Sequence, residues 1–285
     1  ACCGAAMQGL FRNGLADPAL IGVSGGGSLG ASIAIFLTGG GLIGASLEPL
    51  VSSLGIEFSH WVLLDKYFVA FMAFVGGLLA TLLVYRLGSS SEGVSVTTML
   101  LAGIAITALA GAFSSLCTYF ADDVALRRLT IWRMGSLESA TWWDVSVCAS
   151  LIGLVICIIP RYGKPLNAML LGESEARHLG FDVVKIKRQL IALTALAMGV
   201  AVASAGVIGF IGLLVPHSVR MLIGPDHRHL IPCASLFGAS IMVLADLGAR
   251  TLLAPEELPV GIVTASIGAP FFILLLIRYK RGLGV

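Results

Sequence analysis

Long apolar runs separated by short polar stretches make up almost the whole chain. Most of these runs are long enough for a helix to cross the hydrocarbon core of a bilayer, which takes about 20 residues. The run at 206–223 is interrupted by Pro216, His217 and Arg220, so a short or broken helix is expected there. The pattern predicts an all-α polytopic membrane protein with nine helical segments, at 1–11, 18–38, 62–86, 94–120, 142–160, 189–204, 206–223, 231–249 and 259–278.

The first run is the shortest. Only 11 residues precede Arg12, and at 1.5 Å per residue they span about 17 Å of a core that is about 30 Å thick. The sequence is therefore expected to begin inside a membrane helix, with whatever precedes that helix absent.

The composition supports a lipid environment for these segments. Hydrophobic residues make up 57% of the chain and charged residues 12%, with a mean hydropathy of +0.96, whereas soluble domains carry about 25% charged residues. A chain this apolar cannot cover its surface with polar groups, so lipid must cover it. Long runs without alternation exclude a β-barrel. The formal net charge of +2 gives no reason to expect a nucleic-acid partner.

The polar connections differ in charge, which orients the chain. They form two sets, one at 12–17, 87–93, 161–188, 217–230 and the C-terminus and the other at 39–61, 121–141 and 250–258. With helix ends included, the first set carries 13 basic and 6 acidic residues, and the second carries 5 and 10. Because Lys and Arg concentrate in cytoplasmic connections, the first set is expected in the cytoplasm. The mixed aromatic and charged residues of 121–141 predict an interfacial helix and turn outside.

The glycine-rich stretch Gly22–Gly30 matches three active-site motifs. Its Gly-x-Gly-x-x-Gly spacing fits a dinucleotide-binding fingerprint, but no strand or βαβ unit is predicted around it. Its Gly-x-Ser-x-Gly spacing fits the nucleophile elbow of a serine hydrolase, which needs the same missing context. Its Gly-x-Ser-Gly spacing resembles the serine motif of rhomboid-type intramembrane proteases. That chemistry needs a base within reach, and His217 is expected at the cytoplasmic end.

Helix packing explains the same stretch better. In lipid, small residues line helix contacts because association depends on close van der Waals packing. The stretch is therefore expected to let another helix or a bulky substrate approach, through Gly22, Ser24, Gly25, Gly26, Gly27 and Gly30.

Charges within the apolar runs are few. Asp246 is the clearest, and Arg250 follows four residues later near the outer end. An ion pair on one helix face is expected, since intramembrane charges find partners. Contact of Arg250 with a substrate or partner is the alternative. No series of acidic or histidine side chains crosses several runs, which argues against a proton-driven pump.

Prolines at 216, 225 and 232 interrupt the stretch from Gly209 to Pro232. Because proline breaks helices, two short helical pieces are expected, at 216–223 and 226–231. Such a compact element at the cytoplasmic end is typical of a docking surface. The His227-x-His229 spacing is weak evidence for a metal, so loop histidines and no metal site are expected. The six cysteines form no metal or disulfide pattern either.

Four ordered blocks carry a resemblance to a known family. They are GAAMQGLFRNGLADPALIGVSGGGSLGA, GESEARHLGFDV, GVIGFIGLLVPHSVRMLIGPDHRHLIP and LADLGARTLLAPEELPVGIVTASIGAPFFILLL. From its first residue nearly to its last, the chain resembles the permease subunits of bacterial ABC importers for iron-siderophores, haem and cobalamin. It departs from the family pattern at Gly14, where members usually have proline in RNPLADP.

The resemblance implies a single transmembrane permease domain over 1–285, with a ten-helix ABC importer permease fold whose first helix is missing from this chain. It also implies a homodimer in the bacterial inner membrane, two cytoplasmic ATPase subunits and a periplasmic substrate-binding protein. Arg250 then docks the binding protein. Coupling helices at 216–229 contact the ATPase, through Pro216, His217, Arg220, Gly224, Pro225, Asp226, His227, Arg228 and His229.

The expected activity is transport, with no catalytic residues. The chain has no G-x-x-x-x-G-K-[ST] pattern, so ATP and Mg are expected on the partner ATPase and no cofactor on this chain. The expected substrate is haem or a ferric siderophore, passed from the binding protein to the cytoplasm by alternating access. The stretches GESEARHLGFDV and WRMGSLESATW resemble the haem branch most. The alternatives are a gradient-driven secondary transporter and an intramembrane serine protease.

Overall fold

The computed structural model describes residues 1–38, 58–90 and 93–282 of the 285-residue chain. The predicted outer connection at 39–61 lies mostly outside them. The elements are α1 (Cys2–Leu10), η1 (Pro18–Ile21), α2 (Val23–Thr38), α4 (Phe58–Gly88), β1 (Ser89–Ser90), β2 (Gly93–Val94), α5 (Val96–Tyr119), α6 (Asp123–Met134), α7 (Trp142–Ile158), η2 (Ile159–Tyr162), α8 (Gly163–Leu171), α9 (Glu173–His178), α10 (Val183–Ala205), α11 (Ile211–Ile223), α12 (His227–Thr251) and α13 (Val260–Gly282). Apart from the small antiparallel β1–β2 hairpin, every described element is helical, which confirms the predicted all-α fold.

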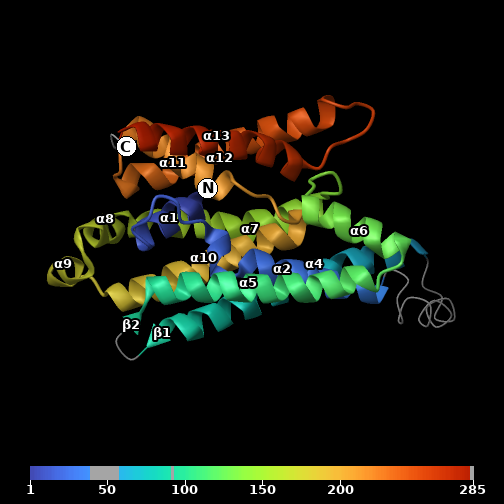
Figure 1. Ribbon diagram of the computed structural model, residues 1–285, viewed down its shortest axis with the longest axis horizontal. Helices are drawn as coiled ribbons and strands as arrows, with labels where there is room; N and C mark the ends of the chain where they lie inside the picture. Colours follow the sequence, from blue (N-terminus) through green and yellow to red (C-terminus); the bar gives the residue numbers. More distant parts are fainter. Residues whose placement is uncertain (39–57, 91–92, 283–285) are drawn as a thin grey trace.

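The helices run back and forth between two ends of the molecule (Figure 1). The β1–β2 hairpin, α8, α9 and the end of α13 lie at one end, called here the inner end. The helix α6 and the connection between α12 and α13 lie at the opposite, outer end. The described members of the two predicted sets of polar connections are therefore separated in space.

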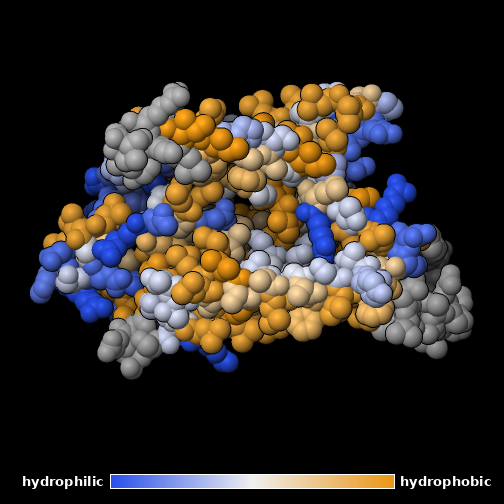
Figure 2. All heavy atoms as spheres, viewed as in Figure 1, coloured by the Kyte–Doolittle hydropathy of each residue, from blue (hydrophilic) through white to orange (hydrophobic). Residues whose placement is uncertain are grey.

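The long helices fit a membrane. Five are long and apolar enough to cross one, at Leu64–Gly88, Val96–Tyr119, Trp142–Leu171, Val183–Ala205 and His227–Thr251, and three shorter apolar helices accompany them. Figure 2 shows hydrophobic side chains along the flanks of the bundle and hydrophilic ones mainly toward its ends. On α5, for example, Leu101 and Ile104 are more than half exposed. Such apolar faces need lipid or another protein to cover them.

Helix α1 lies at the centre of the core. All of its residues are buried, and it packs against α10, α11 and α12. The helix therefore has no face left for lipid. Its side chains join the largest hydrophobic cluster, which extends through α8 and α10 to the start of α12.

Polar residues in the connections set where the helices begin. Each caps a helix by accepting a hydrogen bond from a backbone N–H two or three residues later, which satisfies a donor that has no partner within the helix. At Asp17 this cap precedes Pro18, and η1 follows before Gly22 (φ +86°) turns the chain into α2. The capping side chains are Asp17, Ser95, Asp122, Thr141, Asp182 and Asp226.

The prediction of two short helices at 216–223 and 226–231 is wrong. Pro216 lies inside α11 and Pro232 lies inside the 25-residue helix α12. A proline removes one backbone hydrogen bond, but neighbouring helices make this tolerable in membrane bundles. Only Gly224, with φ +91°, ends a helix in this stretch. The 206–223 run does contain a short helix, which starts only at Ile211.

Candidate functional site

The turn between α11 and α12 forms one part of the inner end. Gly224 adopts a φ of +91° at the end of α11, a conformation that glycine reaches without strain. Pro225 follows, and the Asp226 carboxylate then accepts a hydrogen bond from the Arg228 backbone N–H at 2.9 Å. This cap starts α12, so the two helices meet in a tight corner rather than in a separate protruding element.

Asn167 of α8 fixes this corner in place. Its side-chain Nδ2 donates to Asp226 Oδ1 at 2.6 Å. Its Oδ1 accepts from the His227 backbone N–H at 2.9 Å and lies 2.9 Å from the His227 ring Nδ1. One amide side chain therefore joins α8 to the start of α12.

Two charged side chains also lie at this corner. The guanidinium of Arg228 forms an ion pair with Asp226 at 2.9 Å. Hydrogen bonds from Arg228 and from Asn167 favour the ionised carboxylate, so they hold the pKa of Asp226 well below its usual range. The Asp226 cap is therefore present throughout the physiological pH range.

The nine predicted coupling residues differ in exposure. Pro216 and His227 are buried, so they contact this chain and are not open to a partner. The His227 ring packs against Gly9, whereas the His229 side chain is exposed, so the two histidines point different ways. Those exposed or partly exposed are His217, Arg220, Gly224, Pro225, Asp226, Arg228 and His229.

The helices α8 and α9 match none of the site residues predicted from the sequence. These two short helices meet at Gly172 and lie at the extreme inner end (Figure 1). Leu171 at the end of α8 is 73% exposed and Leu179 after α9 is 62% exposed. Contiguous exposed apolar patches mark protein or membrane contacts, whereas single exposed apolar side chains are common, so the two leucines make this surface a candidate contact only. The sequence signal for a short helix here was the pair of glycines that flanks ESEARHL. In the structure both Gly172 and Gly180 have positive φ.

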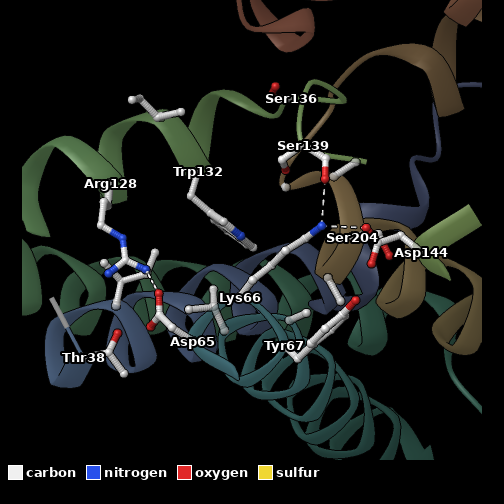
Figure 3. A pocket seen from close by; sticks show the side chains of 17 residues that line it. Thr38, Asp65, Lys66, Tyr67, Arg128, Trp132, Ser136, Ser139, Asp144 and Ser204 are labelled. Atoms are coloured by element: carbon white, nitrogen blue, oxygen red, sulfur yellow. Dashed lines mark hydrogen bonds and ion pairs between the residues drawn. The ribbon is translucent and has the colours of Figure 1, made fainter. Parts of the chain in front are cut away.

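A cavity of about 640 Å³, lined by apolar residues and by several charged ones, lies at the outer end between α2, α4, α6, α7 and α10. Figure 3 shows Lys66 of α4 reaching across it toward α7. The Lys66 Nζ lies 2.6 Å from Asp144 Oδ2 and donates to the Ser139 carbonyl at 2.7 Å. Its neighbour Asp65 pairs with Arg128 of α6. Two consecutive residues of α4 therefore tie this helix to α6 and to α7.

The contacts that Lys66 makes should stabilise the outer end. Lys66→Met is expected to lower the free energy of unfolding by about 1 kcal/mol, because a charge-assisted hydrogen bond to Asp144 is lost. The melting temperature in detergent should fall by a few degrees. The control is Arg127→Met, since Arg127 is exposed and has no ion pair within the described part of the chain. Equal melting temperatures for the two variants would contradict this role.

Arg250 lies at the outer end of α12. It forms the predicted pair with Asp246, at 2.9 Å, and approaches Glu257 at 3.9 Å. The i,i+4 ion pair is confirmed. The Arg250 side chain is still 43% exposed, so part of it remains available to a partner.

Gly26 and Gly30 bring α2 into backbone contact with α4. A Cβ at Gly26 would lie 2.3 Å from the carbonyl oxygen of Gly76, and one at Gly30 would lie 2.0 Å from the carbonyl oxygen of Met72. No side chain fits at either position. This is the close approach that small residues permit in membrane helices.

The rest of the glycine stretch faces other helices. Gly25 faces Thr107 of α5 and Gly27 faces Val202 of α10. Gly22 precedes α2, and Ser24 is partly buried in its first turn. Among the described residues, no hydrogen bond joins Ser24 to a histidine, so the structure offers no general base for a serine nucleophile.

A bundle of apolar helices, five of them long enough to cross a membrane, defines a polytopic membrane protein. A family model described as the FecCD transport family matches residues 1–278. The chain belongs to the FecCD transport family, whose members here are ABC importer permeases. It is a multi-pass protein of the bacterial inner membrane.

Individual relatives agree with this assignment. The chain is 43% identical over 279 residues to the hemin transport system permease protein HmuU of Yersinia pestis, covering 98% of this chain and 77% of that protein. It is 38% identical to the vitamin B12 import system permease protein BtuC of Vibrio vulnificus, covering 96% and 76%. A solved structure of a metal-chelate-type ABC transporter in an inward-facing conformation matches with a TM-score of 0.82 and 31% identity, covering 98% of this chain and 81% of that one.

Proposed function

We propose that this permease passes haem, or a ferric siderophore, from a periplasmic binding protein into the cytoplasm by alternating access. The higher identity to a hemin permease, 43% against 38% for a vitamin B12 permease, supports haem as the first substrate to test. Two copies of the chain form the permease and two ATPase subunits drive it. ATP and Mg bind to the ATPase, and the permease itself carries no cofactor.

The observation that carries this proposal is the inner-end surface, formed by α8, α9 and the turn at 220–229. Asn167 joins α8 to the start of α12, and α9 follows α8 directly along the chain. Leu171 and Arg228 are exposed on this surface. The ATPase contact is therefore wider than the 216–229 segment alone, and it excludes the buried side chains Pro216 and His227.

The binding protein docks at the outer end. Arg250 is available there, held in place by Asp246 and Glu257. A carboxylate on the binding protein would replace Glu257, the more distant of the two acidic partners, at little cost. Surface ion pairs of this kind contribute more to specificity and association rate than to affinity.

Reconstitution tests the substrate and the energy source together. The permease is purified with its cognate ATPase and binding protein, placed in vesicles, and supplied with haem, a ferric siderophore or cobalamin. Haem is expected to stimulate ATP hydrolysis and to accumulate in the vesicles, and the siderophore is the second expectation. Uptake driven by an ion gradient without the ATPase would instead favour a secondary transporter.

A further inference from the structure

Lys187 is an unusual residue for its position. It lies in the second turn of α10, and it is the only buried Lys, Arg, Asp or Glu among the side chains that the structure describes, with 3% of it exposed. A buried ammonium is costly unless it is paired and hydrogen-bonded. Its partners therefore show which parts of the molecule it holds together.

Two partners satisfy Lys187, and each belongs to a different segment. Its Nζ lies 2.6 Å from Glu173 Oε1, at the first residue of α9. It also donates to the Val94 carbonyl at 3.0 Å, at the end of the β1–β2 hairpin that joins α4 to α5. One ammonium group thus links α9, the hairpin and α10 at the inner end.

The linked segments lead from the docking surface to the outer cavity. Helix α9 is exposed at Glu175, Arg177 and His178, and only Ala176 is buried. Helix α10 has 23 residues, about 34 Å at 1.5 Å per residue. Its last residues line the outer cavity with Lys66. A displacement of α9 can therefore reach the outer end through one rigid helix.

We propose that Lys187 is a positioning residue that transmits movement of α9 to α10 and to the α4–α5 hairpin. This inference rests on the proposed contact of α8 and α9 with the ATPase. Without the ammonium, α9 stays joined to α10 by a short turn, but its first residue is no longer held to the other two segments. ATP hydrolysis then continues with less movement of the transmembrane helices.

The test compares Lys187→Met with Lys187→Arg and with Lys185→Met, in the assembled complex with its ATPase. Lys185 lies on the same helix, is exposed, and has no side-chain ion pair among the described residues. Three quantities are measured: the rate of ATP hydrolysis, the melting temperature, and the ATP-induced change in amide hydrogen exchange in outer-end peptides covering 136–144 and 203–210. The only ligand added is ATP with Mg.

Lys187→Met is expected to hydrolyse ATP close to the wild-type rate, while the ATP-induced exchange change falls at least about twofold, the lower limit for residues on a coupling route. Lys187→Arg should recover most of it and Lys185→Met all of it. An undiminished exchange change in Lys187→Met overturns the inference. So does a parallel loss of hydrolysis, exchange change and melting temperature, which marks a purely structural role. A wild-type complex with no ATP-induced change would overturn the proposed function itself.

Discussion

Replacing Gly30 with leucine is expected to reduce the yield of folded permease sharply. A Cβ at this position would lie 2.0 Å from the Met72 carbonyl oxygen, and a backbone atom within a helix cannot move aside as a flexible side chain can. Overpacking of this kind costs about 3 kcal/mol, a large part of a typical total stability of about 5–15 kcal/mol. Fluorescence-detected size exclusion of detergent extracts should show little monodisperse protein.

Gly111→Leu is the matched control for this experiment. Gly111 is exposed in the middle of α5, and a Cβ there would meet nothing within 4 Å. Leucine also has a higher helix propensity than glycine by about 0.8 kcal/mol, so the yield should be unchanged or higher. If both variants gave the same yield, the contact between α2 and α4 would not be the determinant of folding described above.

Leu171→Arg is expected to separate the permease from its ATPase without unfolding it. The Leu171 side chain is 73% exposed, so the substitution removes little internal packing. A positive charge at the end of α8 is also compatible with the helix dipole. In the proposed interface, however, a desolvated charge replaces an apolar contact. The affinity for the ATPase should fall about 30-fold, equivalent to roughly 2 kcal/mol.

Leu252→Arg provides the comparison at the other end of the molecule. Leu252 is 67% exposed and follows the last residue of α12. Both variants therefore change an exposed leucine at the C-terminal end of a helix, but at opposite ends of the molecule. ATPase binding, measured by co-purification and by titration in nanodiscs, should be unaffected. Equal losses in the two variants would remove the α8–α9 corner from the docking surface.

The inner and outer ends differ in how their polar contacts are built. At the inner end, the neutral amide of Asn167 and the buried Lys187 each join two or three segments. At the outer end, Asp65 and Lys66 form two partly exposed ion pairs. Exposed pairs are weak and screened by salt.

Sequence alone determined the class of the protein, the nine apolar segments and their separation into two ends. Hydropathy is a property of consecutive residues, and a helix of about 20 apolar residues has few alternatives in lipid. The Asp246–Arg250 pair was also predictable, because residues four apart always share a helix face. The family resemblance rested on four blocks of consecutive residues, which are also local features of the sequence.

Tertiary structure decided which polar residues meet. Lys66 and Asp144 are 78 residues apart, and Lys187 and Val94 are 93 apart, so no local pattern could pair them. The same holds for Pro216 and Pro232, where helices continue through prolines that local rules treat as breaks. The burial of His227 and the exposure of Leu171 likewise depend on how α1, α8 and α12 pack. Local sequence determines where helices form and how hydropathic they are. The partners and the exposure of a side chain are determined only when distant segments pack against one another.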